Sequence, residues 1–172
     1  MPKSFAPTLG WKRHEPAGPP QGLMLPLGGT ARSAQGASMS EPAVFRFALR
    51  VYWEDTDAGG VVFYANYLKF FERARTEWLR SFGYSQEALR HDSGAIFIVT
   101  DTSLRYLRPA RLDDHIEVTV DLGRRTYTRM IFAQQAWRGA ELLAEGSIGV
   151  ACVHAGTFKP RAIPNDLLKS IG

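Results

Sequence analysis

Cysteine is almost missing from this sequence of 172 residues, and Cys152 is its one example. A single cysteine forms no disulfide within its own chain, which excludes a disulfide scaffold and is typical of a reducing, cytoplasmic compartment. Cys152 lies in an apolar segment, so we expect a small core residue rather than a nucleophile. The four histidines show no spacing typical of metal ligands, so we predict no metal site and no bound cofactor.

Long apolar runs are missing as well. No stretch approaches the roughly 20 apolar residues that a membrane-spanning helix needs, so we predict no integral membrane segment. The net charge is only +4. Four basic residues and one acidic residue lie in the first 38 positions, which leaves 17 basic and 16 acidic residues in the remainder. Such a nearly neutral body lacks the charge pattern of a nucleic-acid-binding protein, so we predict no nucleic-acid partner.

The first 42 residues differ in composition from the rest of the chain. Seven of the ten prolines lie here, separated mainly by glycine, serine and alanine. This composition buries too little apolar surface to fold, so we expect a disordered N-terminal extension over residues 1–42 and a globular domain over residues 43–172. Met39 stands just before the globular pattern begins. A translation start at Met39 and a genuine flexible tail are therefore both open.

Apolar periodicity in the domain predicts one strand, one long helix and then about four strands. Residues 45–51 alternate in the manner of a half-buried strand, and apolar side chains recur every three or four positions over residues 66–82, as in an amphipathic helix. Further patterns predict strands at residues 95–106, 115–122, 127–138 and 142–154, a turn at residues 123–125, and short helices at residues 85–90 and 164–171. Gly146 and Gly149 indicate a bend or a close neighbour in the last strand. The order predicts an α+β fold, in which one central helix is wrapped by a curved antiparallel sheet of about five strands.

The most informative segment is EDTDAGGVVFYANY, residues 54–67. Three carboxylates, those of Glu54, Asp55 and Asp57, precede two glycines and the expected start of the helix. Glycines allow backbone to approach a ligand closely, and a helix start offers free N–H groups and the positive end of a dipole. This combination predicts a reactive carboxylate. Asp57 as a turn residue is the simpler alternative; Glu54 and Asp55 are most simply solvated or structural, and Asn66 most simply the helix N-cap.

Two segments resemble a known family. They are VYWEDTDAGGVVFYANYLKFFERARTEWLR, residues 51–80, and RYLRPARLDDHIEV, residues 105–118. Both are similar to motifs of the YbgC-type branch of hotdog-fold acyl-CoA thioesterases, the 4-hydroxybenzoyl-CoA thioesterase-like family. The resemblance spans residues 44–165. It implies the hotdog fold, hydrolysis of a short-chain aliphatic or aromatic acyl-CoA to the free acid and CoA, and a homodimer or homotetramer with the site between subunits.

The resemblance also implies roles for individual residues. Asp57 would act either as a nucleophile on the thioester carbonyl or as a base that activates water. The backbone N–H of Tyr64 would polarise the thioester oxygen. Related proteins often carry His where this chain has Tyr64, and this departure leaves the choice of substrate and any side-chain role at this position open. We expect the substrate to contact Gly59, Gly60, Val61, Asn66, Tyr67 and, through a CoA phosphate, Arg108.

Glu72 on the expected long helix is the second candidate for the catalytic carboxylate, because another hotdog branch uses a helical Glu. Its simpler interpretation is a surface carboxylate that pairs with Arg75 on the solvent face of the helix.

Two other functions stay open. A hydratase or dehydratase on the same fold usually uses a His at the site, and residues 51–67 contain none. A non-catalytic protein that binds acyl groups or partner proteins is the remaining alternative.

Overall fold

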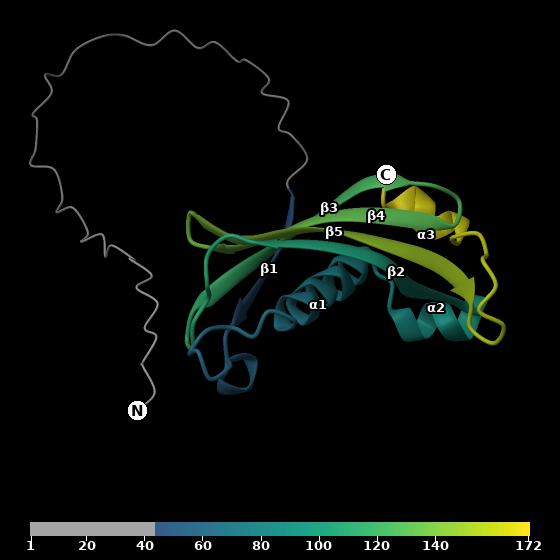
Figure 1. The fold of residues 1–172 in the computed structure, drawn as a ribbon. Coiled ribbons are helices and arrows are strands. Elements are labelled where there is room, and N and C mark those ends of the chain that lie inside the picture. Colours follow the sequence, from purple (N-terminus) through teal and green to yellow (C-terminus); the bar gives the residue numbers. More distant parts are fainter. Residues whose placement is uncertain (1–43) are drawn as a thin grey trace, which may run out of the picture. The chain divides into compact units, whose positions relative to one another are not determined.

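The structure is a computed structural model that describes residues 44–172. The extension expected over residues 1–42 and the alternative start at Met39 lie outside the described residues. Within the described part, five strands, three α-helices and one 3-10 turn follow one another along the chain (Figure 1). Their bounds are β1 Phe45–Arg50, η1 Trp53–Asp55, α1 Asn66–Ser81, α2 Gln86–Ser93, β2 Ala95–Tyr106, β3 His115–Arg125, β4 Arg129–Arg138, β5 Glu141–His154 and α3 Asn165–Ser170.

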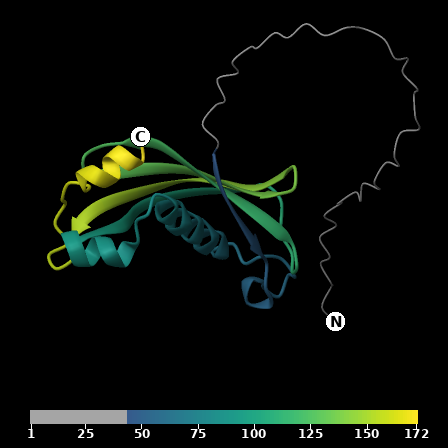
Figure 2. The ribbon, with the colours of Figure 1, turned by 180° about the vertical axis from the view of Figure 1, so that it is seen from behind.

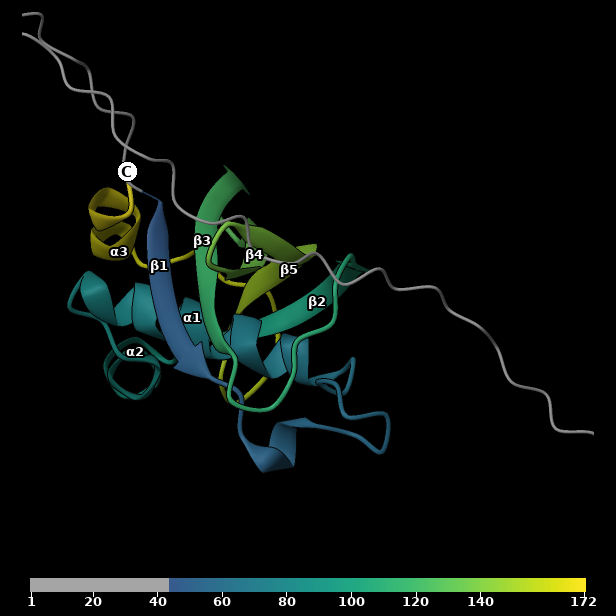
Figure 3. The ribbon, with the colours of Figure 1, turned by 90° about the vertical axis from the view of Figure 1, so that its left-hand side faces the viewer.

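The five strands form one sheet in the order β1-β3-β4-β5-β2, and every neighbouring pair is antiparallel. The sheet curves over α1, which lies along its concave face (Figures 1 and 2). Seen from the side, the strands arch above the helix from β1 at one edge to β2 at the other (Figure 3). The predicted architecture of one long helix wrapped by a five-stranded antiparallel sheet is confirmed.

The core lies between α1 and the concave face of the sheet. Phe70, Phe71 and Ala74 are fully buried on the helix, and Ile116 and Val118 face them from β3. Burial of each large apolar side chain contributes about 1.5–3 kcal/mol relative to exposure. The apolar residues that recur every three or four positions on α1 and every second position on the strands therefore form one core. This packing holds α1 in place and so positions the residues at its start.

The turn predicted at residues 123–125 is wrong. Gly123 belongs to β3, where the register with β4 shifts between Leu122 and Arg125. Glycine is common both in β-bulges and in turns, and in this structure Gly123 lies in a bulge. The chain reverses just after it, where the hydroxyl of Thr126 accepts the backbone N–H of Arg129 at 3.1 Å.

The close neighbours predicted for the two glycines of β5 are confirmed. A Cβ atom on Gly146 would lie 2.6 Å from the backbone oxygen of Ser103. A Cβ atom on Gly149 would lie 2.2 Å from the carboxylate of Asp101. Both partners belong to β2, so these glycines allow β2 to lie tightly against β5.

Candidate active site

Asp57 stands in a tight turn between β1 and α1. Its backbone N–H donates to the carbonyl of Val61 at 2.9 Å, and its own carbonyl accepts the N–H of Gly60 at 2.9 Å. Gly60 has φ +71°, a left-handed conformation that favours glycine. The turn therefore closes on itself and leaves the side chain of Asp57 exposed.

The carboxylate of Asp57 has one occupied oxygen and one free oxygen. Oδ1 accepts the backbone N–H of Gly59 at 2.8 Å, and a Cβ atom on Gly59 would lie 3.0 Å from this oxygen. Oδ2 forms no hydrogen bond or ion pair with any residue from 44 to 172. Asp57 therefore serves as a turn residue and still presents an oxygen that can reach water or substrate.

Asp55 and Asn66 tie this loop to the helix. The buried carboxylate of Asp55 accepts the backbone N–H of Tyr52 at 2.9 Å. Its carbonyl accepts the N–H of Phe63 at 2.9 Å and the side-chain amide of Asn66 at 3.0 Å. Asp55 is thus structural, one of the two simple roles expected for it, and it is buried rather than solvated.

The expectation that Asn66 is the N-cap of the helix is wrong. Ala65 occupies the cap position without a side-chain cap, and Asn66 is the first helical residue. Its side chain points back toward the loop and is buried, so its amide donates to Asp55 rather than accepting a helical N–H.

The start of α1 leaves a donor available beside the turn. Within residues 44–172 the backbone N–H of Tyr64 donates to no acceptor. The carbonyl of the same residue accepts the hydroxyl of Tyr106 at 3.0 Å. This bond joins the start of α1 to the end of β2 and anchors the backbone just after the Tyr64 N–H, which lies in the preceding peptide.

One cavity of about 330 Å³ brings these groups together. Five of the predicted site residues line it: Asp57, Val61, Tyr64, Tyr67 and Arg108. Gly59, Gly60 and Asn66 lie outside its lining, where they shape the turn and the helix start. The residues that complete the lining are Val62, Tyr106, Leu107 and Pro109.

Two tyrosines, Tyr67 and Tyr106, line the same cavity with their ring centroids 5.6 Å apart. Tyr67 is buried and its hydroxyl accepts the backbone N–H of Ala110 at 3.2 Å. Burial raises the pKa of the Tyr67 hydroxyl, and partial burial also raises the pKa of Tyr106. Both side chains therefore stay neutral at physiological pH. Arg108 supplies the positive charge at the rim, with its guanidinium exposed and its Nε 3.8 Å from a carboxylate oxygen of Glu141.

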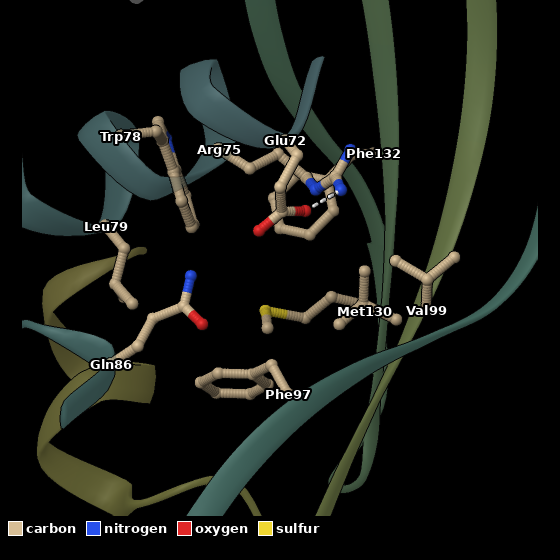
Figure 4. A pocket seen from close by; sticks show the side chains of 10 residues that line it. Glu72, Arg75, Trp78, Leu79, Gln86, Phe97, Val99, Met130 and Phe132 are labelled. Atoms are coloured by element: carbon tan, nitrogen blue, oxygen red, sulfur yellow. Dashed lines mark hydrogen bonds and ion pairs between the residues drawn. The ribbon is translucent and has the colours of Figure 1, made fainter. Parts of the chain in front are cut away.

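Glu72 lies outside the lining of the Asp57 cavity. It forms the predicted ion pair with Arg75, and its own side chain is 51% exposed, as expected of a surface carboxylate. The expected placement of Arg75 on the solvent face is wrong, because the Arg75 side chain is only 9% exposed. Arg75 points under the helix, where its Nη1 donates to Oε1 of Gln134 at 2.6 Å. Both Glu72 and Arg75 line a second region, shown in Figure 4.

Two absences concern the described part of the chain. Between residues 44 and 172 no helix has the length and apolar character needed to cross a membrane. In the same range no group of three or more His, Cys, Asp or Glu side chains is arranged to hold a metal ion.

Comparisons with known proteins agree on one family. The family model described as the thioesterase-like superfamily matches residues 51–171, which include the Asp57 turn, α1 and strands β2 to β5. The acyl-CoA thioester hydrolase YbgC of Escherichia coli O6:H1 is 43% identical over 126 residues, which cover 73% of this chain and 93% of that protein. The acyl-CoA thioesterase YbgC of Haemophilus influenzae is 41% identical over 123 residues, covering 72% and 90%.

A solved structure extends this agreement to the fold. The crystal structure of a probable thioesterase from Bartonella henselae is 33% identical to this chain. It superposes with a TM-score of 0.67 and covers 71% of this chain and 100% of its own.

Proposed function

This chain belongs to the thioesterase-like superfamily and resembles the YbgC acyl-CoA thioesterases over most of its length, and from this premise we propose that it hydrolyses acyl-CoA thioesters to a free acid and CoA. The family and the hotdog fold expected from the sequence are thereby confirmed. The observation that supports the proposal is a cavity lined by both Asp57 and Tyr64. Within residues 44–172 the Oδ2 of Asp57 and the backbone N–H of Tyr64 have no hydrogen-bond partner. Thioester hydrolysis needs these two elements, a group that drives attack on the carbonyl and a donor that stabilises the oxyanion.

In the first route, Asp57 acts as a general base. Its Oδ2 accepts a proton from a water molecule, and the water oxygen attacks the thioester carbonyl carbon. The carbonyl oxygen gains the negative charge and accepts a hydrogen bond from the Tyr64 N–H. The C–S bond then breaks, the acid leaves with the new oxygen, and the CoA sulfur takes up the proton that Asp57 held.

In the second route, Asp57 acts as a nucleophile. Its carboxylate oxygen attacks the carbonyl carbon, the C–S bond breaks with release of CoA, and a mixed anhydride joins the acyl group to Asp57. Water then cleaves the anhydride. Single-turnover hydrolysis in ¹⁸O-water with enzyme in excess tests for the second route. Label in Asp57 establishes the anhydride, because it arises only when water attacks the aspartyl carbonyl, whereas the base route labels only the product acid.

The rim of the cavity suits the nucleotide end of the substrate. The exposed guanidinium of Arg108 lines the same cavity as Asp57 and offers donors to a phosphate. We assign it to a CoA phosphate, and the acyl group to a short-chain aliphatic or aromatic acid. The reaction would take place in the cytoplasm.

A homodimer or homotetramer belongs to the same proposal. The edge strand β2 has a neighbour on one side only in the described sheet, and Val99 on β2 and Leu68 on α1 expose 48% and 37% of their surface. A second copy would cover both the open edge and the apolar side chains. Light scattering coupled to size exclusion measures the state directly, and a monomer at micromolar concentration would contradict this part of the proposal.

The test of the function is CoA release from a panel of acyl-CoA thioesters with short, long and aromatic acyl groups. We expect release from at least one class, followed as free thiol. A crotonyl-CoA sample is monitored for water addition, which is the reaction expected of a hydratase. Release of no thiol from any thioester would reject the proposal, and hydration without hydrolysis would favour the hydratase alternative.

A further inference from the structure

Three cavities follow one another along the seam between α1 and β2. The Asp57 cavity uses Tyr67 of the helix and Tyr106 of the strand. The second, of about 450 Å³, begins at Leu68 and extends to Arg75, with Thr102 and Val99 on the strand side. The third, of about 50 Å³, lies beyond. Because the numbers of the lining residues rise along the helix and fall along the strand, the three cavities lie one after another with increasing distance from Asp57. The second copy proposed above would cover the second cavity at Leu68 and Val99.

The third cavity is a small apolar chamber. Its walls are mostly apolar side chains from α1, β2, β4 and β5: Trp78, Leu79, Phe97, Val99, Met130, Phe132 and Val150. Its volume is several times the volume that one water-sized group needs, so it has room for a few methylene groups. Figure 4 shows the aromatic side chains and Met130 around this space. An apolar acyl chain that reached it would lose contact with water and be bound more tightly.

An ion pair lies between this chamber and the second cavity. Glu72, Arg75 and Val99 line both the second and the third cavity, and Figure 4 shows the carboxylate of Glu72 directed into the space and bound to Arg75. By the rise of an α-helix, Glu72 lies about 9 Å along α1 from Asn66. The pair therefore stands at the depth that a medium-length acyl chain would reach.

The guanidinium of Arg75 is held firmly from behind. It donates to Oε1 of Gln134 at 2.6 Å, and Nε2 of Gln134 donates to the carbonyl of Phe71 at 3.0 Å. Gln134 is fully buried, so this network fixes one member of the pair. Glu72 keeps contact with water, since its side chain is 51% exposed.

We propose that the Glu72–Arg75 pair sets the upper length of the acyl group that the enzyme accepts. This inference rests on the proposed thioesterase function and names a specificity determinant of the same site. A methylene chain that passes the pair must strip water from the half-exposed carboxylate of Glu72 and offers no hydrogen bond in return. A short chain ends before the pair and avoids this cost. The apolar chamber beyond the pair stays unused by the natural substrate.

The test replaces the pair by apolar side chains of similar length, Glu72→Leu with Arg75→Met. Replacing both partners leaves no unpaired charge, which is the change that buried ion pairs tolerate best. The matched control is Glu77→Leu with Arg80→Met, the same substitutions in another Glu–Arg pair three residues apart on α1. Glu77 and Arg80 line none of the three cavities. Because loss of the Gln134 partner can weaken folding, Glu72→Gln serves as a second, conservative variant.

The readout is kcat/KM for a series from acetyl-CoA to dodecanoyl-CoA. We expect the wild type and the control to share one length limit. Beyond that limit the double variant gains about fourfold per added methylene until the chamber is full, and Glu72→Gln gains less. A folded double variant, or Glu72→Gln in its place, with the wild-type length profile would overturn the proposal.

A binding experiment separates this inference from the proposed function. A chain in the chamber contacts Trp78, so dodecanoate should change the tryptophan fluorescence of the double variant and leave that of the wild type and the control unchanged. This readout needs no turnover. If no protein releases CoA but the fluorescence difference appears, the proposed thioesterase function is wrong, and the role of the Glu72–Arg75 pair as a barrier to long acyl chains is supported. If CoA is released and all proteins give the same fluorescence change, the proposal that the Glu72–Arg75 pair limits the acyl length is wrong.

Discussion

Asn66→Ala should weaken both the fold and the activity, because it cuts the tie between α1 and the loop that carries Asp57. The substitution removes the 3.0 Å bond from the Asn66 amide to the carbonyl of Asp55. That carbonyl keeps the N–H of Phe63 at 2.9 Å, so the loss is one hydrogen bond of about 0.5–1.5 kcal/mol rather than a fully unpaired buried group. Asn66 is 95% buried. Its truncation therefore also leaves a void where the amide was, which adds to the loss of stability.

The better helix propensity of alanine returns up to about 0.7 kcal/mol. We therefore expect the free energy of unfolding to fall by about 1 kcal/mol and Tm by about 3–6 °C for a domain of this size. Activity should fall further than stability alone requires. Misplacement of reacting groups by about 1 Å can cost on the order of 100-fold, so we expect kcat to fall at least tenfold while the protein remains folded at the assay temperature.

The matched control is Asn165→Ala. Asn165 is also the first residue of a helix, α3, and follows a cap residue without a side-chain bond, but it is exposed. Its substitution should change the free energy of unfolding by less than about 0.5 kcal/mol and leave kcat unchanged. Denaturant melts and thiol release are measured on both variants. If the two variants are equally stable and equally active, the structural role assigned to Asn66 is refuted.

Two further outcomes are expected. Gly146→Ala should lower the free energy of unfolding by about 1–3 kcal/mol in denaturant melts, since the new Cβ meets the backbone oxygen of Ser103. Gly149→Ala should lower it less, since the exposed side chain of Asp101 can move aside. Equal losses of stability in the two variants would contradict this distinction. Cys152 is buried and its thiol pKa is raised by burial, so it should react with Ellman's reagent only as fast as the protein unfolds, and rapid labelling of native protein would contradict this placement.

The fold was predictable because the period of apolar residues is a local property of the sequence. The predicted bounds of the strands and of α1 lie within a few residues of the observed bounds. The errors arose where one residue type serves two structures. Gly123 fits a bulge and a turn equally well, and Asn66 fits a cap and a buried donor equally well. In each case a tertiary partner decided the outcome, β4 for Gly123 and Asp55 for Asn66.

The candidate site was predictable on one side only. Asp57, Val61, Tyr64 and Tyr67 lie within one continuous motif, so their proximity follows from the local chain. The opposite wall comes from the end of β2, and the contact between Tyr106 and the Tyr64 carbonyl depends on the pairing of distant strands. The segment RYLRP, residues 105–109, contains these residues, but its charge marks only Arg108 as a candidate.

The burial of Arg75 could also not be predicted from the sequence. A charged residue on an amphipathic helix is normally solvated. Its partner Gln134 lies 59 positions away on β4. The strand period of two places Gln134 on the face of Met130 and Phe132, but which helical residue it meets depends on how α1 packs on the sheet.

The most direct test of the account is kcat of Asp57→Asn, measured as thiol release from the best acyl-CoA beside wild type and Glu54→Gln. Asparagine keeps an oxygen that can accept the Gly59 N–H, so the turn should persist while the carboxylate is lost. Glu54 is an exposed carboxylate of the same loop and should tolerate its substitution. We expect Asp57→Asn to lower kcat by roughly a hundredfold or more, with unchanged Tm and near-normal turnover by Glu54→Gln. Near-normal turnover by folded Asp57→Asn would contradict the central claim that this carboxylate performs the reaction.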